Sequence, residues 1–497
     1  MAWLPMEYLL SHAVPDDAFY YFQTARNIVH GRGVSVDGEV WANGFHPLWL
    51  LTILPVFATF RGDAETPIHV SLTLSALAVS GSGPLLFLLA RRLGLDVVPS
   101  LAVTSLYLFH PLILLMSVNG LETGLNLALF VVTLYFFVRA HQEPSIGTYA
   151  AMSAAGGLLV LSRTDYGIVV AAMMLWLLWR SRSERCVASV AALGIPALLV
   201  TLPWFAWSQV TFGSPVQVSA GAVPYVAHRW PNASDASLVE DMLESVRRVR
   251  EAVVETVPSL YLGPNLEMAW MGVLLVVGLL LAALLLPWRN ARANTLRLGI
   301  LAAPFAGLLL QLAIHTGVRW YLREWYVLPL LVIVLLLMGH VVEELRHVRF
   351  GHVAALALLA TFMALFLPRA VNAYREGWYP VQLDMLTAAR WIDANTPPQT
   401  RVGAFNSGIV GYYSERVTVN LDGVMNPEAV EAIRDRRLAA YIREKDLDLL
   451  VDYPFYPFWF YAPFLGGRLQ ERQLAAFNAH PSFQGPYTVW SVSPVPE

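Results

Sequence analysis

An acidic pair stands near the start of the chain, where Asp16 and Asp17 follow Pro15. A carboxylate at such a place can act as a general base in group transfer. The stretch 15–35 predicts an amphipathic helix suited to lie at a membrane surface, with one face that carries Asp16, Tyr20, Gln23 and Asn27. The plainer alternative is that Asp16 caps this helix and Asp17 stabilises its first turn.

Two further polar residues stand beside apolar runs. His46 precedes the run that begins HPLWL, where an imidazole can contact a lipid phosphate. The alternative is an interfacial histidine in an aromatic belt with Trp41 and Trp49. Glu122, in NGLETGL, is costly next to a membrane unless it is solvated, paired or used. Its alternative role is to stabilise the N-terminal end of the following helix.

Arginines stand in two other short polar segments. SRTDYG contains Arg163 and Asp165, whose simplest interpretation is a local ion pair. HTGVRWYLREW contains Arg319 and Arg323. Arginine binds phosphate through paired hydrogen bonds and keeps its charge. The alternative for both arginines is a belt of arginine and aromatic side chains at the membrane boundary.

The composition indicates which elements position these residues. Of 497 residues, 56% are hydrophobic and 14% are charged, and the mean hydropathy is +0.52. These values exclude a disordered chain and an ordinary cytosolic protein, and indicate a polytopic membrane protein. The net charge of −3 gives no basic field for nucleic acid. The single cysteine, Cys186, excludes an internal disulfide or a CxxC zinc site, and the Walker A, HExxH and GxGxxG motifs are missing.

Eleven apolar runs predict the membrane domain, which we place at 46–368 with about 10–12 helices. The runs are 46–60, 67–90, 98–118, 121–138, 147–161, 166–179, 187–210, 266–287, 298–315, 326–342 and 351–367. A crossing needs about 20 residues, and 46–60 is short. If 1–45 lies outside, 46–60 cannot be a full crossing before 67–90. Either 46–60 is re-entrant or lies at the membrane surface, or one boundary elsewhere is wrong, and the exact helix count near 46–90 stays open.

The distribution of arginine predicts the orientation. One set of alternate short loops is rich in arginine, which marks it as cytoplasmic. The opposite loops contain 119–123, 162–167, 211–265 and 315–325, and everything after 368 is expected on the same outer face. Residues 1–45 are expected to form the first outer loop. The unusual polar residues therefore share one face of a bundle, which suits a lipid-phosphate substrate.

The last part of the chain, 369–497, predicts a small extracytoplasmic α/β domain. Its apolar runs are shorter and its turn residues more frequent than in the rest of the chain. The expected elements are helices at 381–394 and about 427–444 and strands at 401–405, 416–422 and 447–453.

The segments DDAFYYFQTARNIVHGRGVS, NGFHPLW, NGLETGL, RTDYG and WYVLP together resemble the GT-C superfamily of integral-membrane glycosyltransferases. The chain looks most like uncharacterised bacterial and archaeal members, which are similar to the protein O-mannosyltransferases, the lipid A aminoarabinose transferase and the terminal arabinofuranosyltransferase. The resemblance covers about 10–370, and GAFNSGIVGYYSERVTVNLDG resembles the outer domain of such proteins.

The resemblance implies an inverting transfer of a sugar from a polyprenyl-phosphate carrier to a glycan, lipid or protein outside the plasma membrane of a prokaryote. It implies that Asp16 is the base, and that Asp17 assists it or holds a divalent metal, which some relatives need. It also implies that His46 contacts the lipid phosphate in place of a lysine, that Glu122 positions substrate, and that Arg319 or Arg323 neutralises the phosphate. The remaining site residues expected are Tyr20, Arg163 and Asp165.

One departure leaves alternatives open. The family has a transmembrane helix before the acidic loop, whereas the first fifteen residues here are too short to span a bilayer. The first helix is therefore expected to be missing, either because the start was assigned late or because the chain is truncated. The alternative functions are a transporter or flippase of lipid-linked sugars, and a membrane scaffold without catalytic activity.

Overall fold

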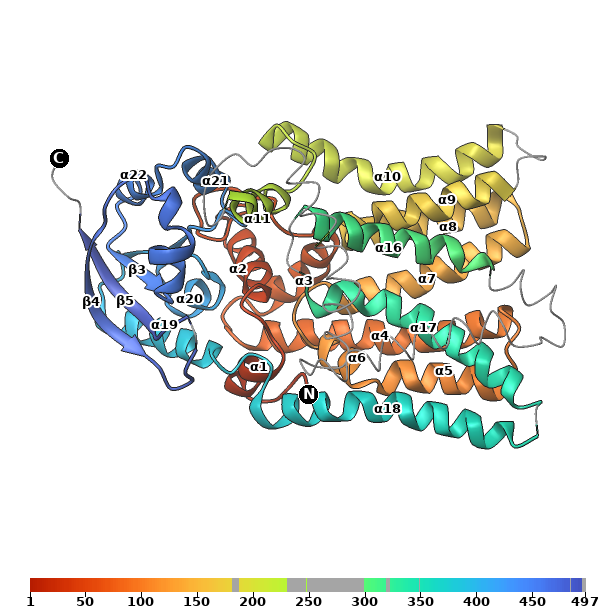
Figure 1. The fold of residues 1–497 in the computed structure, drawn as a ribbon. Coiled ribbons are helices and arrows are strands. Elements are labelled where there is room, and N and C mark those ends of the chain that lie inside the picture. Colours follow the sequence, from red (N-terminus) through yellow and green to blue (C-terminus); the bar gives the residue numbers. More distant parts are fainter. Residues whose placement is uncertain are drawn as a thin grey trace.

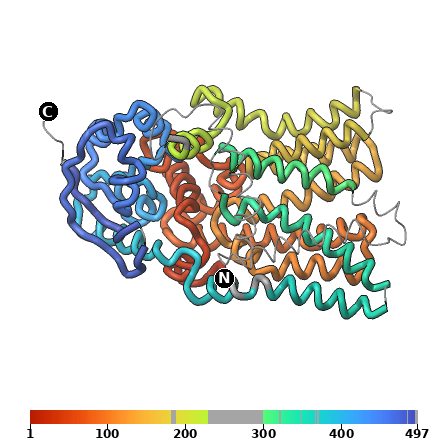
Figure 2. The backbone as a smooth tube through the Cα atoms, viewed as in Figure 1, coloured from red at the N-terminus to blue at the C-terminus, as the bar shows by residue number. Residues whose placement is uncertain are grey.

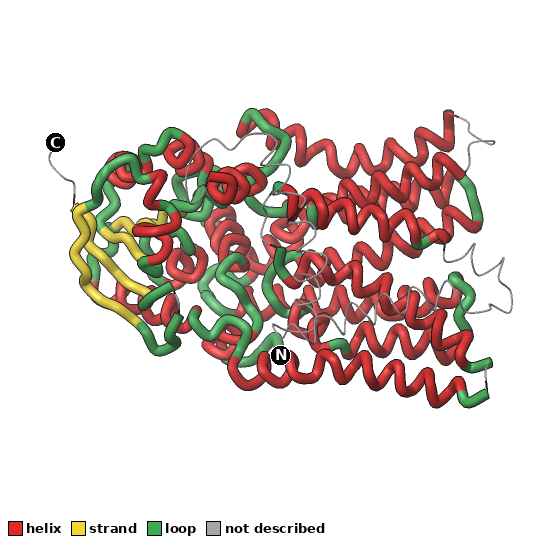
Figure 3. Tube along the Cα trace, in the orientation of Figure 1, coloured by secondary structure: helices red, strands yellow, loops and turns green. Residues whose placement is uncertain are grey.

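The computed structural model describes residues 1–180, 187–229, 247, 299–318, 322–347, 349–482 and 484–493. Long helices form a bundle, and an α/β domain covers one end of it (Figure 1). All the strands of the five-stranded sheet lie in this domain (Figure 3). The first segment of the chain, up to α3, lies between the bundle and the α/β domain (Figure 2).

The described apolar runs form helices, as the sequence predicts. The bundle contains α4 (Thr66–Arg92), α5 (Val97–Phe109), α6 (Pro111–Met116), α7 (Thr123–Gln142), α8 (Ile146–Ser162), α9 (Gly167–Arg180), α10 (Val187–Phe212), α16 (Ala302–Gly317), α17 (Glu324–Leu345) and α18 (Gly351–Glu376). The expected run 98–118 is divided between α5 and α6, because Pro111 cannot continue the first helix. The expected run 266–287 lies outside the described residues.

Four of the described helices are long and apolar enough to cross a membrane: α4, α7, α10 and α17. Almost all of the most apolar segment of α17 is buried, whereas α10 is mostly exposed. The core of the bundle therefore contains α17, and α10 presents an apolar surface to the lipid. These features make the chain a multi-pass membrane protein.

The two ends of the bundle differ as the arginine distribution predicts. The segments before α7, after α8, after α16 and before α17 lie at the end that meets the α/β domain (Figure 1). The arginine-rich ends of α4 and α9 lie at the opposite end. All the described polar segments selected from the sequence therefore converge at one end of the bundle.

The α/β domain begins with α19 (Gln382–Asn395) and β1 (Arg401–Ala404), followed by α20 (Gly408–Tyr413) and β2 (Val417–Asn420). It continues with α21 (Pro427–Arg434), α22 (Leu438–Glu444), β3 (Leu449–Asp452), β4 (Gln470–Phe477) and β5 (Tyr487–Ser493). The strand order is β2-β1-β3-β5-β4, in which β1 is parallel to β2 and β3 while β5 is antiparallel to β3 and β4.

The predicted helix at 381–394 and the three predicted strands are confirmed within a residue or two at most ends. The predicted helix 427–444 is wrong as a single element, because the chain turns between α21 and α22 and Arg436 adopts a positive φ of 53°. The sequence did not predict α20, β4 or β5.

The junction between the two parts is built around α2 (Ala18–Val29). The helix packs against α3 (Pro47–Thr59) and against α20. Phe19 contacts the Tyr412 ring edge-on, and Phe22 stacks on Phe57. The expectation that this helix lies on the membrane surface is wrong, because protein covers its polar and its apolar faces.

The short helix α3 has 13 residues, which gives a length of about 20 Å. That length is less than the roughly 30 Å of a hydrocarbon core, so α3 alone is too short for a straight crossing. It follows the His46 loop directly and lies beside α2 (Figure 1).

Candidate active site

The two members of the acidic pair have different surroundings. The carboxylate of Asp16 accepts hydrogen bonds from the main-chain N–H groups of Gly408 (3.1 Å) and Ile409 (2.6 Å), and only 8% of the residue is exposed. Asp17 is exposed, and its side chain makes no hydrogen bond that caps α2. Of the pair, Asp17 is therefore the residue whose carboxylate a substrate can reach.

The environment shifts the pKa of both carboxyls upward. Burial raises the pKa of Asp16 to about 7, against the opposing effect of the two N–H donors. Desolvation by the surrounding protein also raises the pKa of Asp17, although its side chain stays accessible, and Glu122 adds to the increase while Arg323 opposes it. A carboxylate with a raised pKa is a stronger base, and this suits Asp17 for accepting a proton from a hydroxyl group.

Arg323 is exposed and directly precedes α17. Its charge lies near enough to Asp17 for each to affect the pKa of the other. The second predicted arginine, Arg319, lies outside the described residues. The accessible acid and an accessible guanidinium thus share this end of the bundle.

The α/β domain adds residues that the sequence analysis missed. The Asn420 amide donates to Ser407 Oγ (3.0 Å) and more weakly to the hydroxyl of Tyr20 (3.4 Å). Asp422 follows β2, and burial raises its pKa to about 7, with Asp17 among its charged neighbours. Asp452 ends β3 and accepts from the N–H groups of Phe405 and Asn406.

These residues lie at the carboxyl ends of the three parallel strands. Ligands of open α/β sheets bind at this edge. The edge faces α2, where Asp16 is bonded to the start of α20. A signal for Asp422 existed in the sequence, because an Asp-Gly pair stands at the end of the predicted strand 416–422. Nothing in the sequence connected this pair with Asp16 and Asp17.

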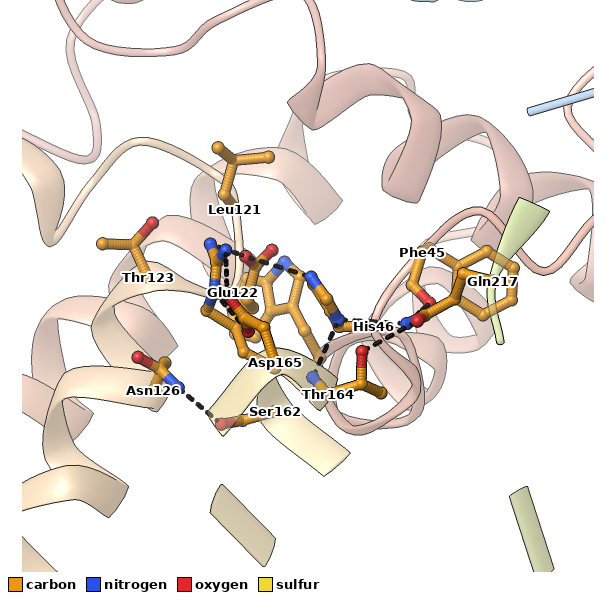
Figure 4. A network of polar contacts seen from close by, with 12 residues as sticks. Phe45, His46, Leu121, Glu122, Thr123, Asn126, Ser162, Thr164, Asp165 and Gln217 are labelled. Carbon is orange, nitrogen blue, oxygen red and sulfur yellow. Dashed lines mark hydrogen bonds and ion pairs between the residues drawn. The ribbon is translucent and has the colours of Figure 1, made fainter. Parts of the chain in front are cut away.

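A second polar cluster is centred on Arg163 and is shown in part in Figure 4. The guanidinium donates to Glu122 Oε1 (3.0 Å) and makes two bonds to the carboxylate of Asp165 (3.3 and 3.1 Å). It also lies 4.2 Å from the centre of the Tyr326 ring. Only 3% of the Arg163 side chain is exposed, so this arginine is committed to its protein partners.

His46 borders this cluster. Its Nδ1 accepts from the main-chain N–H of Thr164 (3.3 Å) and lies 3.1 Å from the Gln217 amide. An N–H group can only donate, so the neutral ring carries its proton on Nε2, which lies 3.9 Å from Glu122 Oε1. Burial lowers the pKa of His46, which favours this neutral form.

The cluster includes partners that the sequence analysis did not select. Tyr21 donates to Glu122 Oε2 (2.8 Å), and Gln311 donates to Asp165 Oδ2 (2.7 Å). His315 Nε2 lies 2.9 Å from the same oxygen of Asp165. Although burial opposes ionisation, Arg163 and His315 together lower the pKa of Asp165. Gln311 was detectable as a polar residue within an apolar run.

The structure thus brings the described site residues into two neighbouring groups. Asp16, Asp17 and Tyr20 lie against the α/β domain, while His46, Glu122, Arg163 and Asp165 form the second cluster. Tyr21 connects the two groups, because it belongs to the same helix as Tyr20 and its hydroxyl donates a hydrogen bond to Glu122. The main-chain N–H of His46 also donates to the Tyr21 hydroxyl (3.0 Å).

A metal site is not evident in the described part of the chain. No group of three or more His, Cys, Asp or Glu side chains there is arranged to hold an ion. Asp16 already accepts two main-chain hydrogen bonds. Whether Asp17 takes part in holding a divalent cation stays a prediction.

Comparisons with known proteins agree with this architecture. Residues 45–207 match the family model described as dolichyl-phosphate-mannose-protein mannosyltransferase, and residues 372–490 match a domain of unknown function. A sequence search of curated proteins gives no match.

Solved structures match over nearly the whole chain. ArnT from Cupriavidus metallidurans in the apo state has 14% identity and a TM-score of 0.55, with 97% of this chain and 95% of that chain covered. ArnT bound to undecaprenyl phosphate has 15% identity and a TM-score of 0.55, with 98% of this chain and 96% of that chain covered. A third match is the archaeal oligosaccharyltransferase AglB from Archaeoglobus fulgidus, in complex with an inhibitory peptide and a dolichol-phosphate. It has 14% identity and a TM-score of 0.56, with 97% of this chain and 70% of that chain covered.

The resemblance expected from the sequence is confirmed at the level of the fold. The solved structures match over nearly the whole chain, and the family match covers the segment from the His46 loop into α10. The chain has the fold of the GT-C superfamily of integral-membrane glycosyltransferases.

Proposed function

We propose that this protein is a glycosyltransferase that moves a sugar from a polyprenyl-phosphate carrier to a glycan, lipid or protein on the outer side of the plasma membrane. One observation carries the proposal: the accessible Asp17 lies near the accessible Arg323 where the α/β domain meets the bundle. Two proteins of similar fold support the donor class, because one was solved with undecaprenyl phosphate and another with a dolichol-phosphate.

In this proposal Asp17, and not Asp16, is the general base. The resemblance implies that Asp16 is the base and Asp17 its assistant, but the contacts of the two side chains favour the opposite assignment. The Asp16 carboxylate is buried and holds two main-chain N–H groups, whereas Asp17 remains accessible. Asp16 is then a positioning residue that fixes α2 to the α/β domain.

The proposed reaction is an inverting displacement. The acceptor hydroxyl oxygen attacks the anomeric carbon, its proton passes to the Asp17 carboxylate, and the bond between that carbon and the phosphate oxygen breaks. The bonding electrons leave with the phosphate, which becomes free polyprenyl phosphate. The configuration at the anomeric carbon inverts because attack and departure take place on opposite faces.

The departing phosphate gains negative charge and needs donors. Arg323 supplies a permanent positive charge on the accessible side of the site. The Nε2–H of His46 is the second donor in our proposal, because Nδ1 already accepts from Thr164. Arg163 is buried and fully paired, so its role is to hold Glu122 and the His46 loop in place.

The division of labour follows the three parts of the chain. Residues 1–45 supply the base, 46–368 hold the lipid-linked donor within the membrane, and 369–497 cover the site from the extracytoplasmic side. The excess of arginine at the opposite end of the bundle supports this orientation.

The test is a transfer assay with the purified full-length chain, membranes as acceptor source and a panel of radiolabelled polyprenyl-phosphate sugars. We expect label to move to the acceptor fraction with release of free polyprenyl phosphate in equal amount. A flippase would instead move the intact lipid across a proteoliposome bilayer. Transbilayer movement without release, or no reaction with any donor alongside an intact fold, would overturn the proposal.

A further inference from the structure

A polar cavity lies away from the acidic pair, between the C-terminal half of α2, the loop that follows it and the α/β domain. Its volume is about 600 Å³. Ligand sites commonly fall between about 300 and 1,000 Å³ and often form between domains. The wall includes Gln23 and Arg26 of α2, Asp37 and Glu39 of the loop, and Glu415 and Arg416 of the α/β domain.

Part of this wall is fixed by its own contacts. Arg26 donates to the Tyr412 carbonyl (3.0 Å) and lies over the Tyr412 ring. Glu39 makes two bonds to Arg401 (2.7 and 2.8 Å), which tie the loop to the start of β1. Arg416 donates to Asp393 and to several main-chain carbonyls. These contacts shape a rigid wall.

Other groups on the wall remain available. Within the described residues, the guanidinium of Arg32 and the carboxylate of Glu415 have no ion pair or side-chain hydrogen bond. Asp37 uses only Oδ1, which accepts from the main-chain N–H groups of Glu39 and Val40. His30 uses Nδ1 toward the Arg26 carbonyl, which leaves Nε2 as an acceptor.

Glu415 adopts a backbone conformation unusual for its residue type. Its φ is +52°, in the left-handed region that glycine and asparagine occupy more easily. A residue held there has a cost in backbone free energy, and such residues gather at ligand sites. Here the strained residue presents an available carboxylate to the cavity wall.

The charges of the wall select the kind of ligand. Three arginines (Arg26, Arg32 and Arg416) face three acids (Asp37, Glu39 and Glu415), so no net charge attracts a strongly ionic molecule. The available groups are a donor, the guanidinium of Arg32, and acceptors on Glu415, Asp37 and His30. Adjacent hydroxyl groups of a sugar match this pattern, because guanidinium and carboxylate groups each bind two hydroxyls at once.

We propose that this cavity binds a neutral oligosaccharide, as a subsite for the acceptor remote from the point of transfer. The role of the cavity as an acceptor subsite rests on the proposed function. The binding of an oligosaccharide in the cavity does not depend on that function. Arg26 lies nine positions after Asp17, a distance of roughly 13 Å along α2. The cavity would therefore hold sugar units that are not themselves attacking the donor.

The test uses the purified full-length chain in detergent and four fluorescent probes: maltotriose, mannotriose, galactotriose and mannotriose 6-phosphate. We expect at least one neutral trisaccharide to bind saturably. E415N should weaken that binding at least tenfold, and R32Q should weaken it as well. Asparagine tolerates the left-handed conformation, so E415N removes the carboxylate without disturbing the fold.

Two controls separate the outcomes. D446N changes another acid with positive φ (48°) that does not line the cavity, and should leave binding unchanged. D17N should abolish transfer but leave binding unchanged. The inference is overturned if no neutral trisaccharide binds, if only the phosphate binds, or if E415N binds as tightly as the wild type. Binding without transfer would contradict the proposed function alone.

Discussion

Asp16 and Ile409 are 393 positions apart in the sequence, yet the main-chain N–H of Ile409 donates a 2.6 Å hydrogen bond to Oδ1 of Asp16. The adjacent N–H of Gly408 donates to Oδ2 of the same carboxylate. One acid of the pair is thereby used to join the α/β domain to the first segment of the chain. The other acid, Asp17, is left accessible.

D16N should loosen this junction. An amide oxygen can accept from one N–H group, but the amide NH₂ is then placed against the other donor. The loss of one hydrogen bond to a charged group costs about 1.5–3 kcal/mol. Thermal unfolding should therefore occur at lower temperature, and trypsin should release the α/β domain sooner. The control is D435N, at an exposed acid of that domain, which should unfold at the same temperature as the wild type. If D16N were as stable as the wild type, Asp16 would not be the residue that joins the two parts.

Gly44 tests the same junction from the membrane side. A Cβ at this position would overlap the Val424 carbonyl oxygen and press on the sulfur of Met425. G44A should therefore separate the His46 loop from the Asp422 loop and lower activity at least tenfold. Gly62 has open space around its Cβ position, so G62A is the matched control. Full activity in G44A, measured by sugar transfer, would show that this close approach is dispensable.

R163M should be strongly destabilising. It leaves the carboxylates of Glu122 and Asp165 buried without their guanidinium, and breaking a buried pair in this way costs about 3–5 kcal/mol. R139M removes an exposed pair with Glu143 and should cost at most about 1 kcal/mol. Melting of the two variants in detergent compares these costs. Similar melting temperatures would mean that the Arg163 cluster contributes little to the fold.

The dependence of transfer on pH should report Asp17. The base must be ionised, and desolvation by the surrounding protein raises its pKa, so activity should increase with pH through a pKa above 3.8. Arg323 opposes the upward shift. R323Q should therefore move the rising limb of kcat/KM to higher pH, and E122Q should move it to lower pH because Glu122 acts in the opposite direction. If the rising limb of kcat/KM stays at the same pH in both variants, Asp17 is excluded as the titrating group.

Much of the fold was predictable because its signals are local. Each described helix of the bundle is an apolar run bounded by polar or turn residues, and the sequence even contains Pro111, which ends α5. The strands β1, β2 and β3 are short apolar segments with strand-forming residues. By contrast, β4 has an exposed face and is held by its pairing with β5, which the local pattern does not reveal.

Only part of the candidate site could be predicted from the sequence, because its contacts and its members from the α/β domain, such as Asn420 and Asp452, lie far along the chain. The location of Asp16, His46, Glu122 and Arg163 on one face followed from the arginine distribution. Which acid stays accessible did not, because the N–H groups that bind Asp16 belong to a helix of six residues far along the chain. The surroundings of α2 were missed for the same reason, since its partners Tyr412 and Phe57 are distant in sequence.

The most direct test of the account compares D17N with D16N in the release of polyprenyl phosphate from a radiolabelled polyprenyl-phosphate sugar. Both variants are first shown to be folded by gel filtration and melting. Loss of a general base lowers the rate by roughly 10²–10⁴. We predict a decrease of that size in D17N and a smaller decrease in D16N that follows its loss of stability. Wild-type turnover in D17N, with turnover abolished in a folded D16N, would contradict the account.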